Sequence, residues 1–184
     1  MKTLIINGSP RKSGDTAALL SELRRYLNGE VTEISAYRDN ISPCTDCRWC
    51  FENRGCVIKD DMDKIYADDY DNLVIASPIH TSLLTGPVVS LASRFQCYYA
   101  ARRFQNDPIV RRQKRGAIIL VGGGDGTYAP ALDLSRMMLR YMNASFDEEN
   151  FALSHNTDNI PAKDDKAALE QVRQIANRLN TEVL

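Results

Sequence analysis

The fold is decided by the stretch Thr3-Leu4-Ile5-Ile6-Asn7-Gly8-Ser9-Pro10-Arg11-Lys12-Ser13-Gly14-Asp15-Thr16. It begins as a short apolar run without charge, which is typical of a strand buried on both faces. The run breaks at Gly8, Pro10 and Gly14, and apolar residues then recur at helical spacing from Ala18 to Leu27. The sequence therefore predicts a strand over about residues 3–8, a polar loop, and a helix over about residues 16–28.

The polar loop has the composition of a phosphate site. It carries hydroxyls at Ser9, Ser13 and Thr16, and two cations at residues 11–12. The helix that follows presents unpaired N–H groups and the positive end of its dipole at the same point. The loop lacks both the nucleoside-triphosphate loop motif and the three-glycine dinucleotide fingerprint. Phosphate binding and a plain helix cap through Asp15 or Thr16 both stay open.

The rest of the chain alternates between strand and helix patterns. Further strands are predicted over about residues 30–37, 73–76, 116–121 and 146–153, and further helices near 62–66, 87–98, 131–141 and 164–179. Such alternation predicts a parallel sheet with helices on both faces. We expect a single α/β domain over residues 1–184, a three-layer sandwich whose five-stranded sheet has the flavodoxin-like order 2-1-3-4-5. A cysteine-rich loop is inserted at about residues 42–57.

Composition excludes several classes of partner. The formal net charge is −1 and 43% of residues are hydrophobic, so neither a nucleic-acid surface nor a membrane surface is expected. No apolar run is long enough to span a bilayer, and Met1-Lys2 leads directly into the first strand without a signal peptide. We therefore expect a cytoplasmic protein, in which five cysteines indicate metal or redox use rather than disulfides.

Three loops leave the carboxyl ends of predicted strands. They are Ser9–Thr16, Ser77–Thr85 and Gly122–Tyr128. In open α/β sheets, ligands bind outside these strand ends, where the strand order switches. Glycines in the third loop let main chain approach a ligand closely, and a flat ring would rest against residues 78–80. The alternative is that all three loops are ordinary turns.

The cysteines form the most specific motif, Cys44-x2-Cys47-x2-Cys50-x5-Cys56. Four thiolates within 13 residues suit a single [4Fe-4S] cluster. Structural zinc is a weaker match, because zinc sites use two knuckles spaced further apart, and a thiol redox loop is the third option. Cys97 stands alone on a predicted helix and is expected to be a small core residue. His155 is expected at the surface.

Four segments resemble a known family: Asn7–Thr16, Ala76–His80, Leu84–Gly86 and Cys56–Met62. Over about residues 3–130 the chain is similar to the NADPH-dependent FMN reductase family, and the four-cysteine segment points to its iron–sulfur flavoprotein branch. The resemblance implies a flavodoxin-like fold, non-covalently bound FMN, and homodimers or homotetramers.

The resemblance also implies the residues that bind the cofactor. The phosphate would be held by Ser9, Arg11, Ser13, Asp15 and Thr16; the isoalloxazine would be lined by Pro78, Ile79, His80, Thr81 and Ser82; and its other side would be closed by Gly123, Gly124 and Asp125. The chain departs from the family pattern at Asp15, usually Asn, and at His80, usually Tyr.

Three functions follow from these observations. The first is an FMN-dependent oxidoreductase that passes electrons between a [4Fe-4S] cluster, or a reduced ferredoxin-like carrier, and a small-molecule acceptor; it needs no catalytic side chain. The second is an NAD(P)H-dependent FMN or quinone reductase whose cysteines hold zinc or nothing. The third is a flavodoxin-like binding protein that has lost its cofactor, an alternative motivated by Asp15, by His80 and by the absence of the Lys that the family usually carries in the helix after Gly86.

Overall fold

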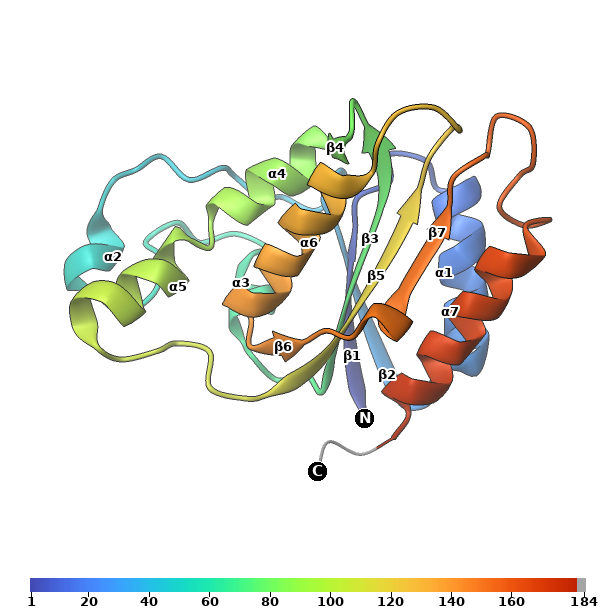
Figure 1. Cartoon of the computed structure of the whole chain (residues 1–184). Helices are drawn as coiled ribbons and strands as arrows, with labels where there is room; N and C mark the ends of the chain where they lie inside the picture. The colour runs from blue at the N-terminus through green and yellow to red at the C-terminus, as the bar shows by residue number, and fades with distance from the viewer. Residues whose placement is uncertain (182–184) are drawn as a thin grey trace.

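A computed structural model describes residues 1–181 as a central sheet with helices on both faces (Figure 1). The strands are β1 (Lys2–Asn7), β2 (Glu30–Ser35), β3 (Asn72–His80), β4 (Leu83–Leu84), β5 (Lys114–Val121), β6 (Ala144–Ser145) and β7 (Phe151–Ser154). The helices are α1 (Asp15–Tyr26), α2 (Trp49–Glu52), α3 (Asp63–Tyr66), α4 (Gly86–Ser93), α5 (Gln96–Ala100), α6 (Ala129–Tyr141) and α7 (Lys166–Leu179), with a π-helix η1 (Ala101–Gln105) and a 3-10 turn η2 (Glu148–Asn150).

The long strands are parallel, as predicted, but the expected five-stranded sheet in the order 2-1-3-4-5 is wrong. Within residues 1–181 the sheet has seven strands, in the order β2-β1-β3-β5-β7 with β4 and β6 in addition. β4 is the antiparallel return of a hairpin, because β3 continues beyond Pro78 to His80. β6 and β7 share one edge of β5, and the turn η2 interrupts that edge between them.

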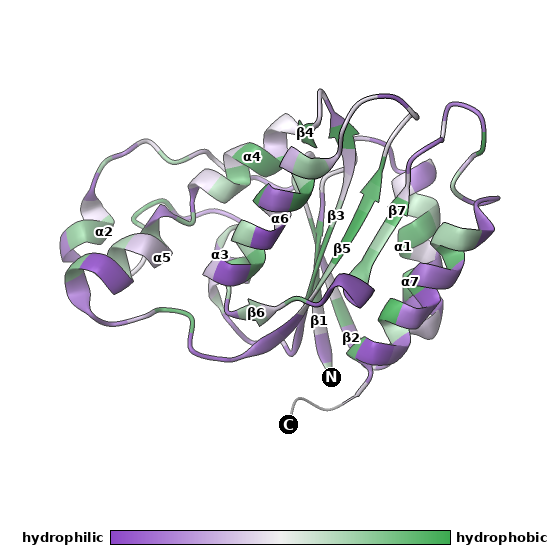
Figure 2. Ribbon diagram, in the orientation of Figure 1, coloured by the Kyte–Doolittle hydropathy of each residue, from purple (hydrophilic) through white to green (hydrophobic). Residues whose placement is uncertain are grey.

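The apolar core lies on both faces of the sheet. Leu4 and Ile6 of β1 face a cluster with residues of α4, α5 and α6, whereas Ile5 faces a second cluster with α1 and α7. Figure 1 shows α1 and α7 on one face and α4 and α6 on the other. Most of β5 and β7 is hydrophobic, while the helices carry hydrophilic residues on their outer sides (Figure 2). This burial on both faces explains why strand residues read as continuous apolar runs.

The predicted helix over residues 87–98 is divided in the structure. It consists of α4 and α5, which continues into η1. A short helix, α2, lies within the cysteine segment, which the sequence predicted to be irregular. The predicted bounds of the other long helices differ from the observed ones by about two residues. Across residues 1–181, no helix combines the length and the apolar character needed to cross a bilayer.

Candidate functional site

A cavity of about 350 Å³ opens at the carboxyl ends of β1, β3, β5 and β7. A volume of this size lies within the usual range for small-molecule and cofactor sites. The lining comes from four loops: Ser9, Pro10, Arg11, Asp15, Thr16, Pro78, Ile79, His80, Val121, Gly122, Gly123, Thr157 and Asp158. The three loops that the sequence singled out therefore converge at one place, and a fourth joins them.

The loop after β1 is held in shape by its own polar groups. The backbone N–H of Ser9 donates to Asn7 Oδ1 at 2.8 Å, and the backbone N–H of Arg11 donates to Ser9 Oγ at 3.2 Å. Gly14, at φ 149°, immediately precedes α1, and no side chain caps this helix. The N–H groups of the first turn of α1 thus keep their capacity to bind an anion, and Arg11 adds a cation to the cavity lining.

Asp15 lies in the cavity lining but has a protein partner. Its Oδ1 accepts a hydrogen bond from the backbone N–H of Ala162 at 2.9 Å. Ala162 is fully buried in the core cluster that also contains residues of α1 and α7. The carboxylate therefore links the start of α1 to the loop that follows β7.

Two predicted residues of the second loop form a tight turn instead of lining the cavity. Pro78, Ile79 and His80 line it, whereas Thr81 and Ser82 connect β3 to β4 with positive φ values of 48° and 66°. Among the other predicted residues, Ser13, Gly124 and Asp125 also lie outside the lining. The structure thus brings eight of the thirteen predicted cofactor residues together: Ser9, Arg11, Asp15, Thr16, Pro78, Ile79, His80 and Gly123.

Glycines after β5 allow a fourth loop to approach. A Cβ on Gly122 would lie 2.5 Å from the His155 ring, and a Cβ on Gly123 would lie 2.7 Å from a carboxylate oxygen of Asp158. These positions need glycine because the loop after β7 is packed directly on the main chain. His155 also meets Tyr128 edge-on, at 5.7 Å between ring centres, so it is part of this packing.

This fourth loop was not predicted from the sequence. The backbone N–H and Oγ1 of Thr157 both donate to the Gly122 carbonyl at 3.0 Å, and the Asp158 N–H donates to the Gly123 carbonyl at 3.1 Å. The available signal was the polar segment that follows β7, because the carboxyl end of every parallel strand meets the same edge.

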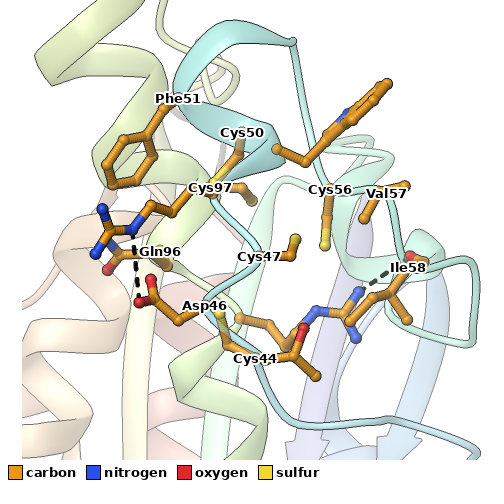
Figure 3. Close-up of a pocket in the computed structure, with 14 residues that line it drawn as sticks. Cys44, Asp46, Cys47, Cys50, Phe51, Cys56, Val57, Ile58, Gln96 and Cys97 are labelled. Atoms are coloured by element: carbon orange, nitrogen blue, oxygen red, sulfur yellow. Dashed lines mark hydrogen bonds and ion pairs between the residues drawn. The ribbon is translucent and has the colours of Figure 1, made fainter.

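The cysteines form a second pocket, of about 20 Å³, next to α4 and α5. Cys44, Cys47, Cys50 and Cys56 all line it. Cys97 of α5 is buried in the core, as predicted, and its side chain also reaches this pocket. Figure 3 shows the side chains of these cysteines gathered around one space. We call it the cysteine pocket.

The cysteine segment is fastened at several points. The backbone N–H of Cys44 donates to Ser93 Oγ at 3.0 Å. Gln105 Nε2 donates to the carbonyls of Cys50 and Asn53, both at 2.8 Å. The segment therefore owes its shape to α4, α5 and η1, which are all parts of the same helical layer.

Burial suppresses ionisation of two of these thiols. Burial raises the pKa of Cys50, and it raises the pKa of Cys97 to about 11 even though a hydrogen bond with Tyr66 acts in the opposite direction. Across the described chain, no group of three or more His, Cys, Asp or Glu side chains is arranged to hold a metal ion. The donor types nevertheless fit a thiolate-bound centre, because four thiols from one segment line one pocket.

Comparisons of sequence identify the family. The family model for NADPH-dependent FMN reductases matches residues 1–158. An iron-sulfur flavoprotein from Archaeoglobus fulgidus is 27% identical over 128 residues, which cover 67% of this chain and 56% of that protein. A second one from the same organism is 32% identical over 123 residues, covering 64% of this chain and 60% of the relative. The aligned part thus spans little more than half the length of these curated relatives.

Solved structures match almost the whole chain. A flavone reductase has a TM-score of 0.70 at 20% identity, covering 98% of this chain and 62% of that chain. An NAD(P)H:quinone oxidoreductase from Methanothermobacter marburgensis has a TM-score of 0.69 at 12% identity, covering 100% and 98%. An FMN-dependent NADH-azoreductase from Bacillus anthracis, solved in complex with FMN, has a TM-score of 0.66 at 16% identity, covering 98% and 100%. These similarities show an α/β flavodoxin-like fold.

Proposed function

Because the chain belongs to the NADPH-dependent FMN reductase family, a family of flavin-dependent oxidoreductases, we propose that it binds FMN in the cavity at the carboxyl ends of β1, β3 and β5. The observation that carries the proposal is the convergence of an uncapped helix N-terminus with two further loops around about 350 Å³. When bound, FMN accepts electrons in pairs and passes them on in pairs or singly.

Different residues around the cavity would contact different parts of FMN. The first turn of α1, with Ser9, Arg11 and Thr16, would hold the phosphate, since free N–H groups and a cation favour an anion. The ring would lie between Pro78–His80 on one side and Gly122–Gly123 on the other. Contacts from Ser13, Thr81, Ser82, Gly124 and Asp125 stay predictions, because these residues lie outside the present lining.

The phosphate half is tested by comparing FMN with riboflavin. Flavin-free protein is titrated with each, and the quenching of flavin fluorescence is followed. We expect FMN to bind at least about tenfold more tightly, since hydrogen bonds to a charged group contribute about 1.5–3 kcal/mol. Arg11→Ala should weaken FMN binding, whereas Lys12→Ala, an exposed neighbour outside the lining, should leave it unchanged. Absence of FMN binding at micromolar concentrations would contradict the proposal and favour the cofactor-less alternative.

We further propose a nicotinamide electron donor, in keeping with the family, and a small-molecule acceptor. Rapid bleaching of bound FMN by NADPH or NADH would support direct hydride transfer. Slow bleaching by both, with fast bleaching by a reduced ferredoxin, would replace the nicotinamide by a protein carrier. The expected homodimer or homotetramer stays a prediction, which sedimentation of the FMN-loaded protein tests.

A second proposal concerns the cysteine pocket: we propose that Cys44, Cys47, Cys50 and Cys56 hold a [4Fe-4S] cluster. The supporting observation is that one pocket is lined by four thiols from 13 residues. A cluster would supply one-electron transfer. The test is anaerobic reconstitution with iron and sulfide, followed by metal analysis. About four irons per chain would support the cluster. Zinc alone would favour the zinc site, and thiols without metal would favour a thiol redox loop.

A further inference from the structure

The cysteine pocket contains a cation that is closed off from solvent. Arg94 follows α4, its side chain is fully buried, and it lines the pocket with the four cysteines of the motif. A buried guanidinium is unfavourable unless its donors find partners. The partners of Arg94 therefore indicate what the pocket is built to hold.

The terminal nitrogens of Arg94 close the cysteine segment. Nη1 donates to Asp60 Oδ2 at 2.7 Å and to the Ser42 carbonyl at 2.9 Å. Nη2 donates to the Ile58 carbonyl at 3.1 Å. Ser42 precedes the first cysteine of the motif and Ile58 follows the last, so one guanidinium fastens both ends of the segment.

One nitrogen of the Arg94 guanidinium, Nε, has no hydrogen-bond partner among residues 1–181, although it is buried. Buried donors without an acceptor are rare, and each calls for an explanation. The side chains of Arg94 and Cys56 line the same pocket. An anionic sulfur group in the pocket would supply the missing acceptor.

We infer that Arg94 is a positioning residue of the cysteine pocket: it closes the cysteine segment and donates its Nε–H to sulfur of the metal centre held by the four thiolates. The inference rests on the occupant proposed above for this pocket. A hydrogen bond to sulfur stabilises the reduced, more negative state of such a centre, and therefore raises its reduction potential.

Two variants separate this role from simple loss of charge. Arg94→Lys keeps a cation beside Asp60 but lacks Nε and the planar fork. Arg94→Gln combined with Asp60→Asn removes both charges together, so that no buried charge is left without a partner. Arg48→Lys is the matched control, because Arg48 also lines the pocket but its side chain is 71% exposed.

The experiment uses the full chain with FMN bound, reconstituted anaerobically with iron and sulfide. FMN retention reports on folding. We expect the midpoint potential of the centre to become more negative in both Arg94 variants, and a chelator to remove their iron about tenfold faster. Arg48→Lys should behave as the wild type. Wild-type potentials in both Arg94 variants would overturn the inference.

The role of Arg94 can still be tested if the cluster proposal fails. If the wild type retains FMN but takes up no iron with sulfide, the cluster proposal fails and Co²⁺ alone becomes the probe. Thiolate–Co²⁺ absorbance in the wild type, with about tenfold weaker affinity in both Arg94 variants, supports the role of Arg94. Equal Co²⁺ affinity in the variants, or no Co²⁺ binding by the wild type, overturns it.

Discussion

The carboxylate of Asp15 accepts a hydrogen bond from the backbone N–H of Ala162 at 2.9 Å, and thereby joins α1 to the loop after β7. The resemblance to FMN reductases implied a phosphate contact at this position, where the usual residue is Asn. The observed hydrogen bond gives Asp15 a structural role that does not depend on a bound phosphate.

Asp15→Asn should therefore bind FMN at least as tightly as the wild type. The amide keeps an oxygen acceptor for Ala162 and removes a negative charge near the phosphate site. Asp15→Ala loses the acceptor and leaves a buried N–H unpaired, so FMN should bind more weakly by about 1–2 kcal/mol. Fluorescence titration measures both affinities. If the alanine variant binds FMN as the wild type does, the link to Ala162 has no part in shaping the site.

Gly8→Ala should destabilise the protein. A Cβ there would lie 2.6 Å from both Ser77 Oγ and a methyl of Val88, in a fully packed region. Such overpacking lowers the free energy of unfolding by about 1–3 kcal/mol. Gly86→Ala is the matched control, because a Cβ at the start of α4 meets nothing within 4 Å. Thermal unfolding should show a lower Tm for the first variant and an equal or higher Tm for the second; a similar fall in both would contradict this packing argument.

Acid should weaken the fold partly through Asp60. Burial alone would raise the pKa of Asp60, but hydrogen bonds from Arg94 and from the backbone N–H groups of Ser42 and Met62 lower it overall. Because the folded-state pKa lies below the ordinary value of 3.8, the stabilisation is fully present above that value. It is lost as the pH falls from there through the folded-state pKa.

Asp60→Asn tests this pH dependence. At pH 7 it should lower the free energy of unfolding by about 3 kcal/mol, because Arg94 keeps a buried charge without its partner. Below the ordinary carboxyl pKa, the loss of stability with falling pH should be shallower than in the wild type. Urea unfolding at several pH values measures both effects. If the free energy of unfolding falls with pH equally in variant and wild type, protonation of Asp60 does not contribute to the acid sensitivity of the fold.

Cys97 should be the slowest thiol to react with iodoacetamide in metal-free protein near pH 8. Its pKa is raised to about 11 by burial, and only the thiolate is nucleophilic. Cys47 is exposed and should be labelled first. Mass spectrometry of peptides taken at successive times gives the order. Equal rates for the two thiols would mean that the pocket around Cys97 opens freely.

The apolar runs at residues 4–6 and 117–121 were predictable because the middles of strands that are buried on both faces consist mainly of apolar residues. The division of the edge into β6 and β7 was not predicted: a single strand was expected over residues 146–153, but the polar residues 147–150 lead into and form the turn η2, and β7 begins only at Phe151. The same holds for the helix predicted over residues 87–98. Its apolar spacing is unbroken in sequence, and the interruption after Ser93 is visible only where Arg94 turns inward to Asp60.

The site was predictable where strand ends carry small or hydroxyl residues. The wall made by Thr157 and Asp158 escaped prediction, because these residues attach through carbonyl groups of Gly122 and Gly123. Contacts to backbone carbonyl groups do not produce a recognisable pattern of residue types in the sequence. The position of Cys97 beside the motif cysteines likewise depends on how α5 packs, which spacing along the chain does not encode.

Helix α4 contacts segments that lead to both pockets. Near its start, Val88 packs against Gly8, which adjoins the loop of the cavity, and at its end Ser93 accepts the hydrogen bond from Cys44. Its eight residues span about 12 Å, two turns that behave as a stiff rod. One short helix therefore contributes contacts next to the loop of the cavity and to the first cysteine of the motif.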